Sequence, residues 1–140
     1  MKNLKILLVF FVLAGIASCS NDDDGNEPIT ADPIVGKWKL QQQFMDGEEF
    51  ELTECEKRTT VEFISNGNIN STDFSEDFET EECVSEISAQ KWENRGNNVY
   101  RITEGNISYD VTIMVSNNSN TLTISSEDDD GSYSMRFVRV

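Results

Sequence analysis

The sequence predicts an all-β fold, an eight-stranded antiparallel up-and-down meander barrel over residues 34–140. No segment of helical length in this range repeats apolar residues at the i, i+3, i+4 spacing of an amphipathic helix. Short segments instead alternate apolar and polar residues or are rich in β-branched and aromatic ones. Clusters of Gly, Asn, Asp and Ser separate these segments at short intervals. One polar face on each strand indicates antiparallel pairing, and a long meander removes its unpaired edges by closing into a barrel.

The first half of this domain supplies three strands and one long loop. The predicted strands are Val35–Phe44, Thr59–Ser65 and Gly67–Phe74. Asn66-Gly67 is predicted to form a hairpin turn, because both residues accept a positive φ. Asp73–Glu86 is crowded with carboxylates, which indicates a long solvated loop.

The second half supplies five further strands joined by tight turns. These are Ile87–Asn94, Val99–Thr103, Ile107–Val115, Thr121–Ser126 and Ser132–Val140. Each turn between them contains Gly, Asn or Asp, the residues that adopt turn conformations most readily. Sequential hairpins of this kind predict neighbouring antiparallel strands, as in a meander.

Alternation also predicts which side chains face the barrel interior. The candidate ligand-binding residues are Trp38, Leu40, Val61, Phe63, Tyr109, Val111, Ile113, Leu122, Ile124, Tyr133, Met135 and Phe137, with Trp92 and Tyr100 expected at the mouth. A small barrel either fills its interior with its own side chains or holds one small ligand. Two functions therefore stay open. The barrel binds a small apolar molecule, or it is packed solid and contacts a protein or glycan partner through its acidic loops.

The N-terminal segment has the composition of a secretory signal. Lys2 and Lys5 precede a nearly unbroken apolar run, and small residues follow. The run is too short to span a bilayer as a stable helix. Ile16-Ala17-Ser18-Cys19 resembles the lipobox of bacterial lipoproteins, which implies a signal peptide over residues 1–18 and acylation of Cys19 with palmitate-like chains. The alternative is an ordinary cleaved signal with a chance cysteine.

Residues 19–33 are predicted to be a disordered acidic tether. Asp22, Asp23 and Asp24 follow the cysteine closely, and such a segment has too few apolar residues to form a core. An acidic run at this place resembles the export signal of surface-exposed lipoproteins. We therefore expect a lipid anchor in the outer membrane with the domain displayed on the cell surface. The alternative is the periplasmic face of the same membrane, with the acidic run as a spacer.

Gly36-Lys37-Trp38 opens the first strand with a Gly-x-Trp pattern. With the lipobox, the acidic tether, the segment KWENRGNNVYRI and a last strand that ends in Arg, this order resembles the lipocalin-like domain of bacterial secreted lipoproteins. The resemblance implies that Trp38 closes one end of the barrel and that an Arg of the last strand lies across it. Arg139 shares the face of Tyr133 and Phe137 and is the expected partner. The alternative is an ordinary core Trp and a surface Arg.

Two cysteines remain in the domain, Cys55 and Cys83. An even pair in an oxidising compartment predicts a disulfide. A redox or metal pair is the less favoured alternative, because the spacing is not Cys-x-x-Cys and the chain contains no His.

Charge and composition exclude several classes of function. The chain has 11 Lys and Arg against 26 Asp and Glu, and its formal charge is −15, which disfavours binding to a phosphate backbone. Without His there is no Ser-His-Asp triad and no His-ligated metal. Asp128-Asp129-Asp130-Gly131 lacks the spacing of an EF-hand and is read as a hairpin turn. We expect a monomeric, non-catalytic protein with no cofactor, no metal and no nucleic-acid partner.

Overall fold

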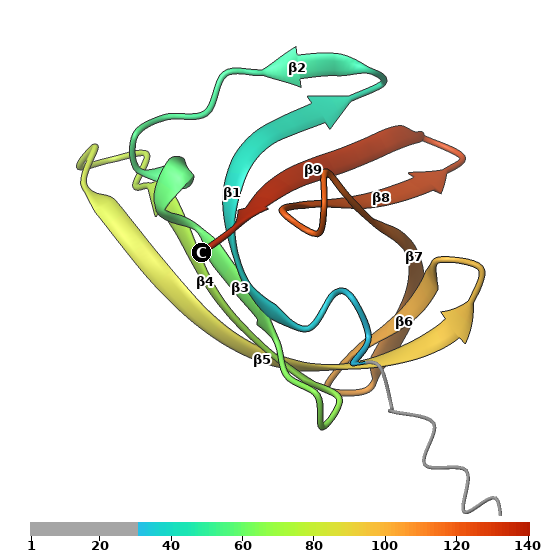
Figure 1. The fold of residues 1–140 in the computed structure, drawn as a ribbon. Helices are drawn as coiled ribbons and strands as arrows, with labels where there is room; N and C mark the ends of the chain where they lie inside the picture. The colour runs from blue at the N-terminus through green and yellow to red at the C-terminus, as the bar shows by residue number, and fades with distance from the viewer. Residues whose placement is uncertain (1–30) are drawn as a thin grey trace, which may run out of the picture.

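The computed structural model describes residues 31–140, which form a barrel of antiparallel strands (Figure 1). The strands are β1 Gly36–Met45, β2 Glu48–Phe50, β3 Thr60–Phe63, β4 Asn68–Glu76, β5 Cys83–Gly96, β6 Val99–Glu104, β7 Ile107–Ser116, β8 Thr121–Asp128 and β9 Gly131–Arg139. A single turn of 3₁₀ helix, η1, spans Glu56–Arg58. The expected signal peptide, the acylated Cys19 and the tether as far as residue 30 lie outside the described residues.

Eight strands close the barrel and confirm the predicted meander. From β3 onward each strand pairs antiparallel with the next, and β9 pairs back onto β1, which also pairs with β3. The strand β2 was not predicted. It pairs with the end of β1 and lies outside the closed ring. In the part of the chain that the structure describes, no helix is long and apolar enough to cross a membrane.

The acidic segment Asp73–Glu86 was predicted as a long loop, and this prediction was wrong. Strand β4 continues to Glu76 and pairs there with Cys83, the first residue of β5. Only residues 77–82 form the turn, in which the Asp77 carboxylate accepts backbone N–H bonds from Glu79 and Thr80 at 2.9 and 2.8 Å. Acidic side chains are compatible with the end of β4 and the start of β5, because these parts of the two strands are exposed to solvent.

The barrel has two different ends. The closed end carries the start of β1 and the turns after β3, β5 and β7, whereas the mouth carries the turns after β1, β4, β6 and β8. The β4–β5 hairpin projects beyond the ring at the mouth, because β5 pairs with β6 only from Lys91 onward. The first described residues also lie at the closed end. There Asp32, expected in the tether, accepts hydrogen bonds from Tyr100 and Asn94.

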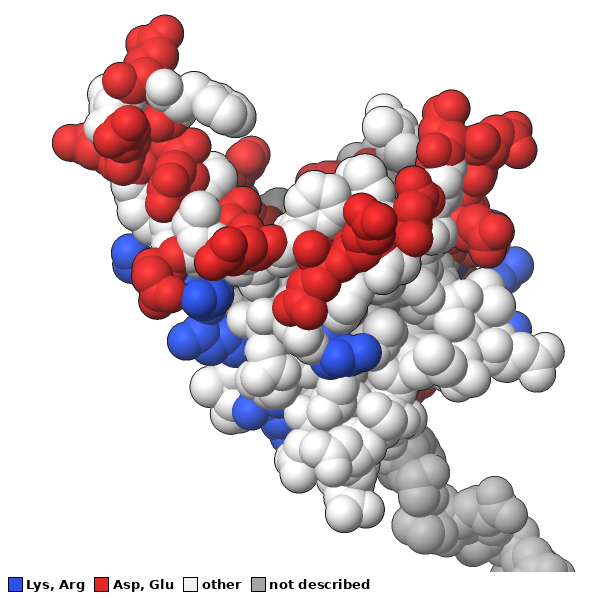
Figure 2. All heavy atoms as spheres, turned by 90° about the horizontal axis from the view of Figure 1, so that it is seen from above, with Lys and Arg blue, Asp and Glu red and all other residues white. Residues whose placement is uncertain are grey.

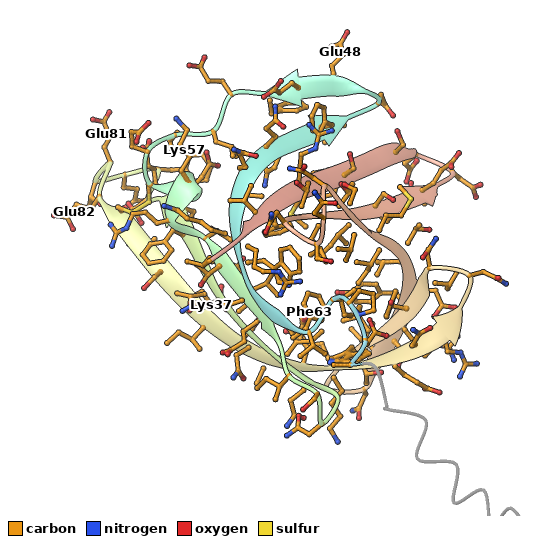
Figure 3. All side chains as sticks on the ribbon, viewed as in Figure 1. Lys37, Glu48, Lys57, Phe63, Glu81 and Glu82 are labelled. Atoms are coloured by element: carbon orange, nitrogen blue, oxygen red, sulfur yellow. A yellow bond between two sulfur atoms is a disulfide. The ribbon has the colours of Figure 1, made fainter. Side chains whose placement is uncertain are left out.

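Alternation along the strands separates an apolar interior from a polar exterior. Phe63 points into the barrel, whereas Glu48, Glu81 and Glu82 point outward (Figure 3). The buried cluster consists of Ile34, Trp38, Leu40, Leu52, Val61, Phe63, Ile69, Tyr100, Ile102, Val111, Ile113, Leu122 and Phe137. Most of these residues lie toward the closed end, which leaves the upper interior less densely filled.

Candidate functional site

A cavity of about 340 Å³ occupies the interior between the closed end and the mouth. Its floor and walls are apolar and come from six of the eight barrel strands: Val61, Phe63, Ile69, Ile102, Val111, Ile113, Ile124, Met135 and Phe137. Phe63 and Ile113 are almost completely buried. A preformed apolar pocket of this size is typical of sites for small molecules, since an apolar ligand leaves water on entering it.

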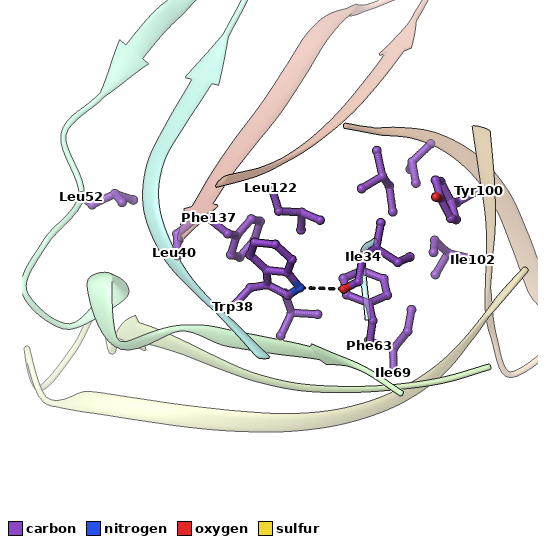
Figure 4. Close-up of a cluster of buried hydrophobic side chains, with 13 residues drawn as sticks. Ile34, Trp38, Leu40, Leu52, Phe63, Ile69, Tyr100, Ile102, Leu122 and Phe137 are labelled. Carbon is purple, nitrogen blue, oxygen red and sulfur yellow. Dashed lines mark hydrogen bonds between the residues drawn. The ribbon is translucent and has the colours of Figure 1, made fainter. Parts of the chain in front are cut away.

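Trp38 fills the space below the cavity. Its side chain has no exposed surface, and its indole Nε1 donates a 2.8 Å hydrogen bond to the carbonyl oxygen of Ile34 (Figure 4). Ile34 and Leu122 are also fully buried in the same cluster. The bond to Ile34 satisfies the only polar group of the indole, as buried Trp side chains require. Trp38 therefore forms a dry plug between the cavity and the closed end.

Arg139 covers this plug from the outside. Its guanidinium carbon lies 4.0 Å from the centre of the Trp38 ring. Its nitrogens donate hydrogen bonds to the carbonyls of Ser119, Val35 and Pro33 at 2.6, 3.0 and 3.0 Å. Gly36 is required beside it, because a Cβ at this residue, whose φ is +137°, would collide with the Arg139 guanidinium. A single side chain thus joins the start of β1, the β7–β8 turn and the Trp38 ring.

Polar side chains replace apolar ones toward the mouth. The polar lining residues are Thr59, Ser71, Asp73, Gln90, Tyr109, Ser126 and Tyr133. Ser71 Oγ lies 2.6 Å from Ser88 Oγ and 3.0 Å from a carboxylate oxygen of Asp73. Gln90 donates a 3.2 Å hydrogen bond to Glu104. Because Asp73, Tyr109 and Ser126 are exposed while the floor is buried, the cavity opens to solvent at this end.

The pKa values of the two tyrosines at the mouth are raised by burial and by nearby carboxylates. Burial raises the pKa of the Tyr109 hydroxyl, and the nearby Glu104 carboxylate raises it further. Burial likewise raises the pKa of Tyr133, with additional contributions from Glu56 and Asp73. Carboxylates on three different elements therefore make the potential at the mouth negative, which favours the neutral form of both phenols.

A family model described as a lipocalin-like domain matches residues 34–135. This match covers more than half of the chain. The chain belongs to the lipocalin-like family. None of the curated proteins compared with the chain matches it. The lipocalin-like family consists in general of non-catalytic binding proteins.

Nine of the fourteen predicted interior residues line the cavity of this lipocalin-like domain: Val61, Phe63, Tyr109, Val111, Ile113, Ile124, Tyr133, Met135 and Phe137. The others do not. Trp38, Leu40 and Leu122 are buried in the cluster of the closed end. Trp92 and Tyr100, expected at the mouth, also lie at the closed end, where their rings are 6.0 Å apart. Tyr100 is buried, and its hydroxyl donates a 3.0 Å hydrogen bond to Asp32.

Burial raises the pKa of the Tyr100 phenol, and the hydrogen bond to the Asp32 carboxylate adds to this effect. The tyrosine therefore stays neutral and serves as a donor that ties the first described residues to β6. Its role is structural, since it is not among the residues that line the cavity of the lipocalin-like domain.

Sequence reasoning missed part of the lining. Ile102 lies two residues after Tyr100 on the same face of β6, so parity alone predicts it. Ile69, Ser71 and Asp73 alternate along the inner face of β4. Two of these three residues are polar, so the inward face of β4 has no continuous apolar pattern by which the sequence could identify it. Within residues 31–140, no group of three His, Cys, Asp or Glu side chains is placed to hold a metal ion.

The two cysteines of the lipocalin-like domain form a disulfide. Cys55, which precedes η1, is bonded to Cys83 at the start of β5, as the sequence predicted. The bond holds the β2–β3 connection against the β4–β5 hairpin. Arg58 follows on the same connection and lies 4.4 Å from the centre of the Phe74 ring. These contacts fix the side of the mouth to which Thr59 and Asp73 contribute.

Proposed function

We propose that this lipocalin-like domain binds a small apolar molecule in the barrel without catalysing a reaction on it. The observation that carries the proposal is the 340 Å³ cavity with a buried apolar floor and a solvent-accessible mouth. The alternative, a solid barrel that acts only through its acidic loops, requires an interior filled by side chains. The unfilled volume above Trp38 favours the binding function over this alternative.

We expect Ile124→Trp to abolish the binding of an apolar fluorescent probe such as 1-anilinonaphthalene. Ile124 is half-buried and lines the cavity, so the larger indole enters the space that a ligand needs. The measurement is a fluorescence titration of residues 19–140 with Cys19→Ser, which prevents acylation and retains the whole described barrel.

Thr123→Trp is the matched control. Thr123 is the neighbouring residue on β8, and it pairs with Arg136, whose side chain lies on the outer face against Phe44. It is not part of the cavity lining. This variant should bind the probe as the parent does. Equal affinity in the Ile124→Trp variant, or no probe uptake by the parent, would overturn the proposed function.

We further propose that Cys19 carries the lipid anchor of a monomeric protein in the outer membrane, with the domain on the cell surface. The lipobox-like residues 16–19 support the anchor, and residues 22–24 support surface display. More than one acyl chain is needed for stable anchoring, because each buried CH₂ contributes only roughly 0.8 kcal/mol. Asp32 docks at the closed end, so the first described residues lie at the end of the barrel opposite the mouth.

Cys19→Ser should transfer the protein from the membrane pellet to the soluble fraction of fractionated cells. The mass of the native protein should exceed that of the polypeptide from residue 19 by its acyl groups, and the variant should lack this excess. A substitution of Asp22, Asp23 and Asp24 by Ala is the companion experiment for display. It should protect the domain from protease added to intact cells. An unchanged membrane fraction for Cys19→Ser contradicts the anchor, and unchanged proteolysis contradicts surface display.

A further inference from the structure

The charges around the cavity are strongly one-sided. Figure 2 shows Asp and Glu gathered over one end of the molecule, with a hollow between two acidic projections and with Lys and Arg below them. The turns at the mouth supply many of these acids, among them Asp46, Asp77 and Asp128–Asp130. An acidic surface by itself serves solubility.

Carboxylates reach the lining itself. Asp73 is a lining residue, held by its contact with Ser71, and Glu104 accepts the hydrogen bond of the lining residue Gln90. Neither carboxylate forms a salt bridge among the described residues. Among residues 31–140, no Lys or Arg belongs to the lining. An anionic head group at the mouth would therefore meet negative charge without a cation to compensate it.

Three basic side chains in the mouth half of the barrel have other partners. Lys57 forms a 2.7 Å ion pair with Glu54. Arg58 lies over the ring of Phe74, and Arg136 donates a 2.7 Å hydrogen bond to Gln42 while it lies over Phe44. None of the three belongs to the cavity lining. These three side chains therefore do not neutralise the carboxylates that face the cavity at the mouth.

We propose that the ligand is an amphipathic organic cation, with its apolar body in the cavity and its ammonium group at the mouth beside Asp73 and Glu104. This inference rests on the proposed function and specifies its ligand class. The apolar floor takes the body, and the carboxylates attract the charge. Tyr109 and Tyr133 also line the cavity, and the faces of aromatic rings attract cations.

Three probes with one apolar body and different head groups test the proposal. Decylamine, decanol and decanoate are cationic, neutral and anionic at pH 7. Calorimetric titration of the 19–140 chain with Cys19→Ser should give the tightest Kd for the amine, with about a tenfold or larger difference between the amine and the carboxylate at low salt. At 1 M NaCl the difference should shrink, because the Debye length falls to about 3 Å.

Charge variants locate the effect. Asp73→Asn and Glu104→Gln should each weaken decylamine binding about fivefold relative to decanol, as expected for the loss of one partly exposed charge. Glu62→Gln is the matched control, because Glu62 lies between the inward residues Val61 and Phe63 and faces the outside of β3. It removes the same charge and should leave the ratio of the two affinities unchanged.

The outcomes separate this inference from the proposed function. Equal affinities for all three probes, or the tightest binding for decanoate, would overturn the cationic ligand and leave the apolar site in place. Failure of all three to bind would overturn both. Amine binding that persists equally in the Ile124→Trp variant would show adsorption to the acidic surface and would also overturn the proposal.

Discussion

Replacing Trp38 with alanine is expected to lower the free energy of unfolding by about 3–5 kcal/mol. The side chain is fully buried, so its removal leaves a large void among Ile34, Leu40 and Leu122. The carbonyl oxygen of Ile34 also loses the hydrogen bond that it accepts from the indole N–H. The guanidinium of Arg139 loses the ring beneath it. These losses act together, because all of these groups meet at the closed end.

The measurement is urea unfolding at pH 7 followed by circular dichroism. Trp92→Ala is the control, because Trp92 is half-buried at the same end and donates a 3.0 Å hydrogen bond to Ile64. Its removal should cost less than that of Trp38. A loss below about 1 kcal/mol for Trp38→Ala, far under the range for large core truncations, would contradict the role of Trp38 as the plug.

A double-mutant cycle separates the stacking of Trp38 and Arg139 from their other contacts. Trp38→Phe and Arg139→Ala, made singly and together, should show a coupling energy of about 0.5–2 kcal/mol, the range for a guanidinium over an aromatic ring. Strictly additive losses would mean that Arg139 stabilises the closed end only through its hydrogen bonds to Ser119, Val35 and Pro33.

Alternation was sufficient to predict the meander because most strands have one apolar face. Val111 and Ile113, for example, face the interior of β7, whereas Met114 is exposed. The end of β4 at residues 75–76 and the start of β5 at residues 83–86 were not predicted, because the inner face of this hairpin is polar beyond Ile69 and its outer part is exposed to solvent. Hydrogen bonding between the two backbones and a disulfide hold it, and neither leaves a periodic apolar signal. The strand β2 was also not predicted. It is three residues long and exposed, so it too shows no periodic apolar pattern.

Parity predicts the direction of a side chain but not the volume left between side chains. The position of the cavity depends on how far Trp38 and its neighbours fill the closed end, which is a property of packing in three dimensions. Trp92 and Tyr100 show this limit. Both face inward as expected, but their place along the barrel axis depends on the strand register, which pairs Trp92 with Ile102 and Tyr100 with Val111. That register places them beside the plug.

Removing the Cys55–Cys83 disulfide is expected to lower the free energy of unfolding by about 3–4 kcal/mol, because the open chain gains conformational entropy when it unfolds. The sequence separation of the two cysteines is 28. A loss of this size is a large part of the stability of a small domain, which is typically about 5–15 kcal/mol. The effect should be strongest at the β4–β5 hairpin, where β5 pairs with β4 but not with β6 between Cys83 and Gln90.

The double variant Cys55→Ala and Cys83→Ala should unfold at lower urea concentration than the parent and with a larger m value, since the unlinked denatured chain exposes more surface. The parent protein unfolded in the presence of a reductant is the control, because it loses the same cross-link and keeps both side chains. The two losses should agree closely. If reduction leaves the midpoint unchanged while the double variant is destabilised, the loss comes from the packing of the buried Cys55 side chain and the cross-link contributes nothing. Since Thr59 and Asp73 lie beside the bridged segments and line the cavity, reduction should also weaken the uptake of an apolar probe.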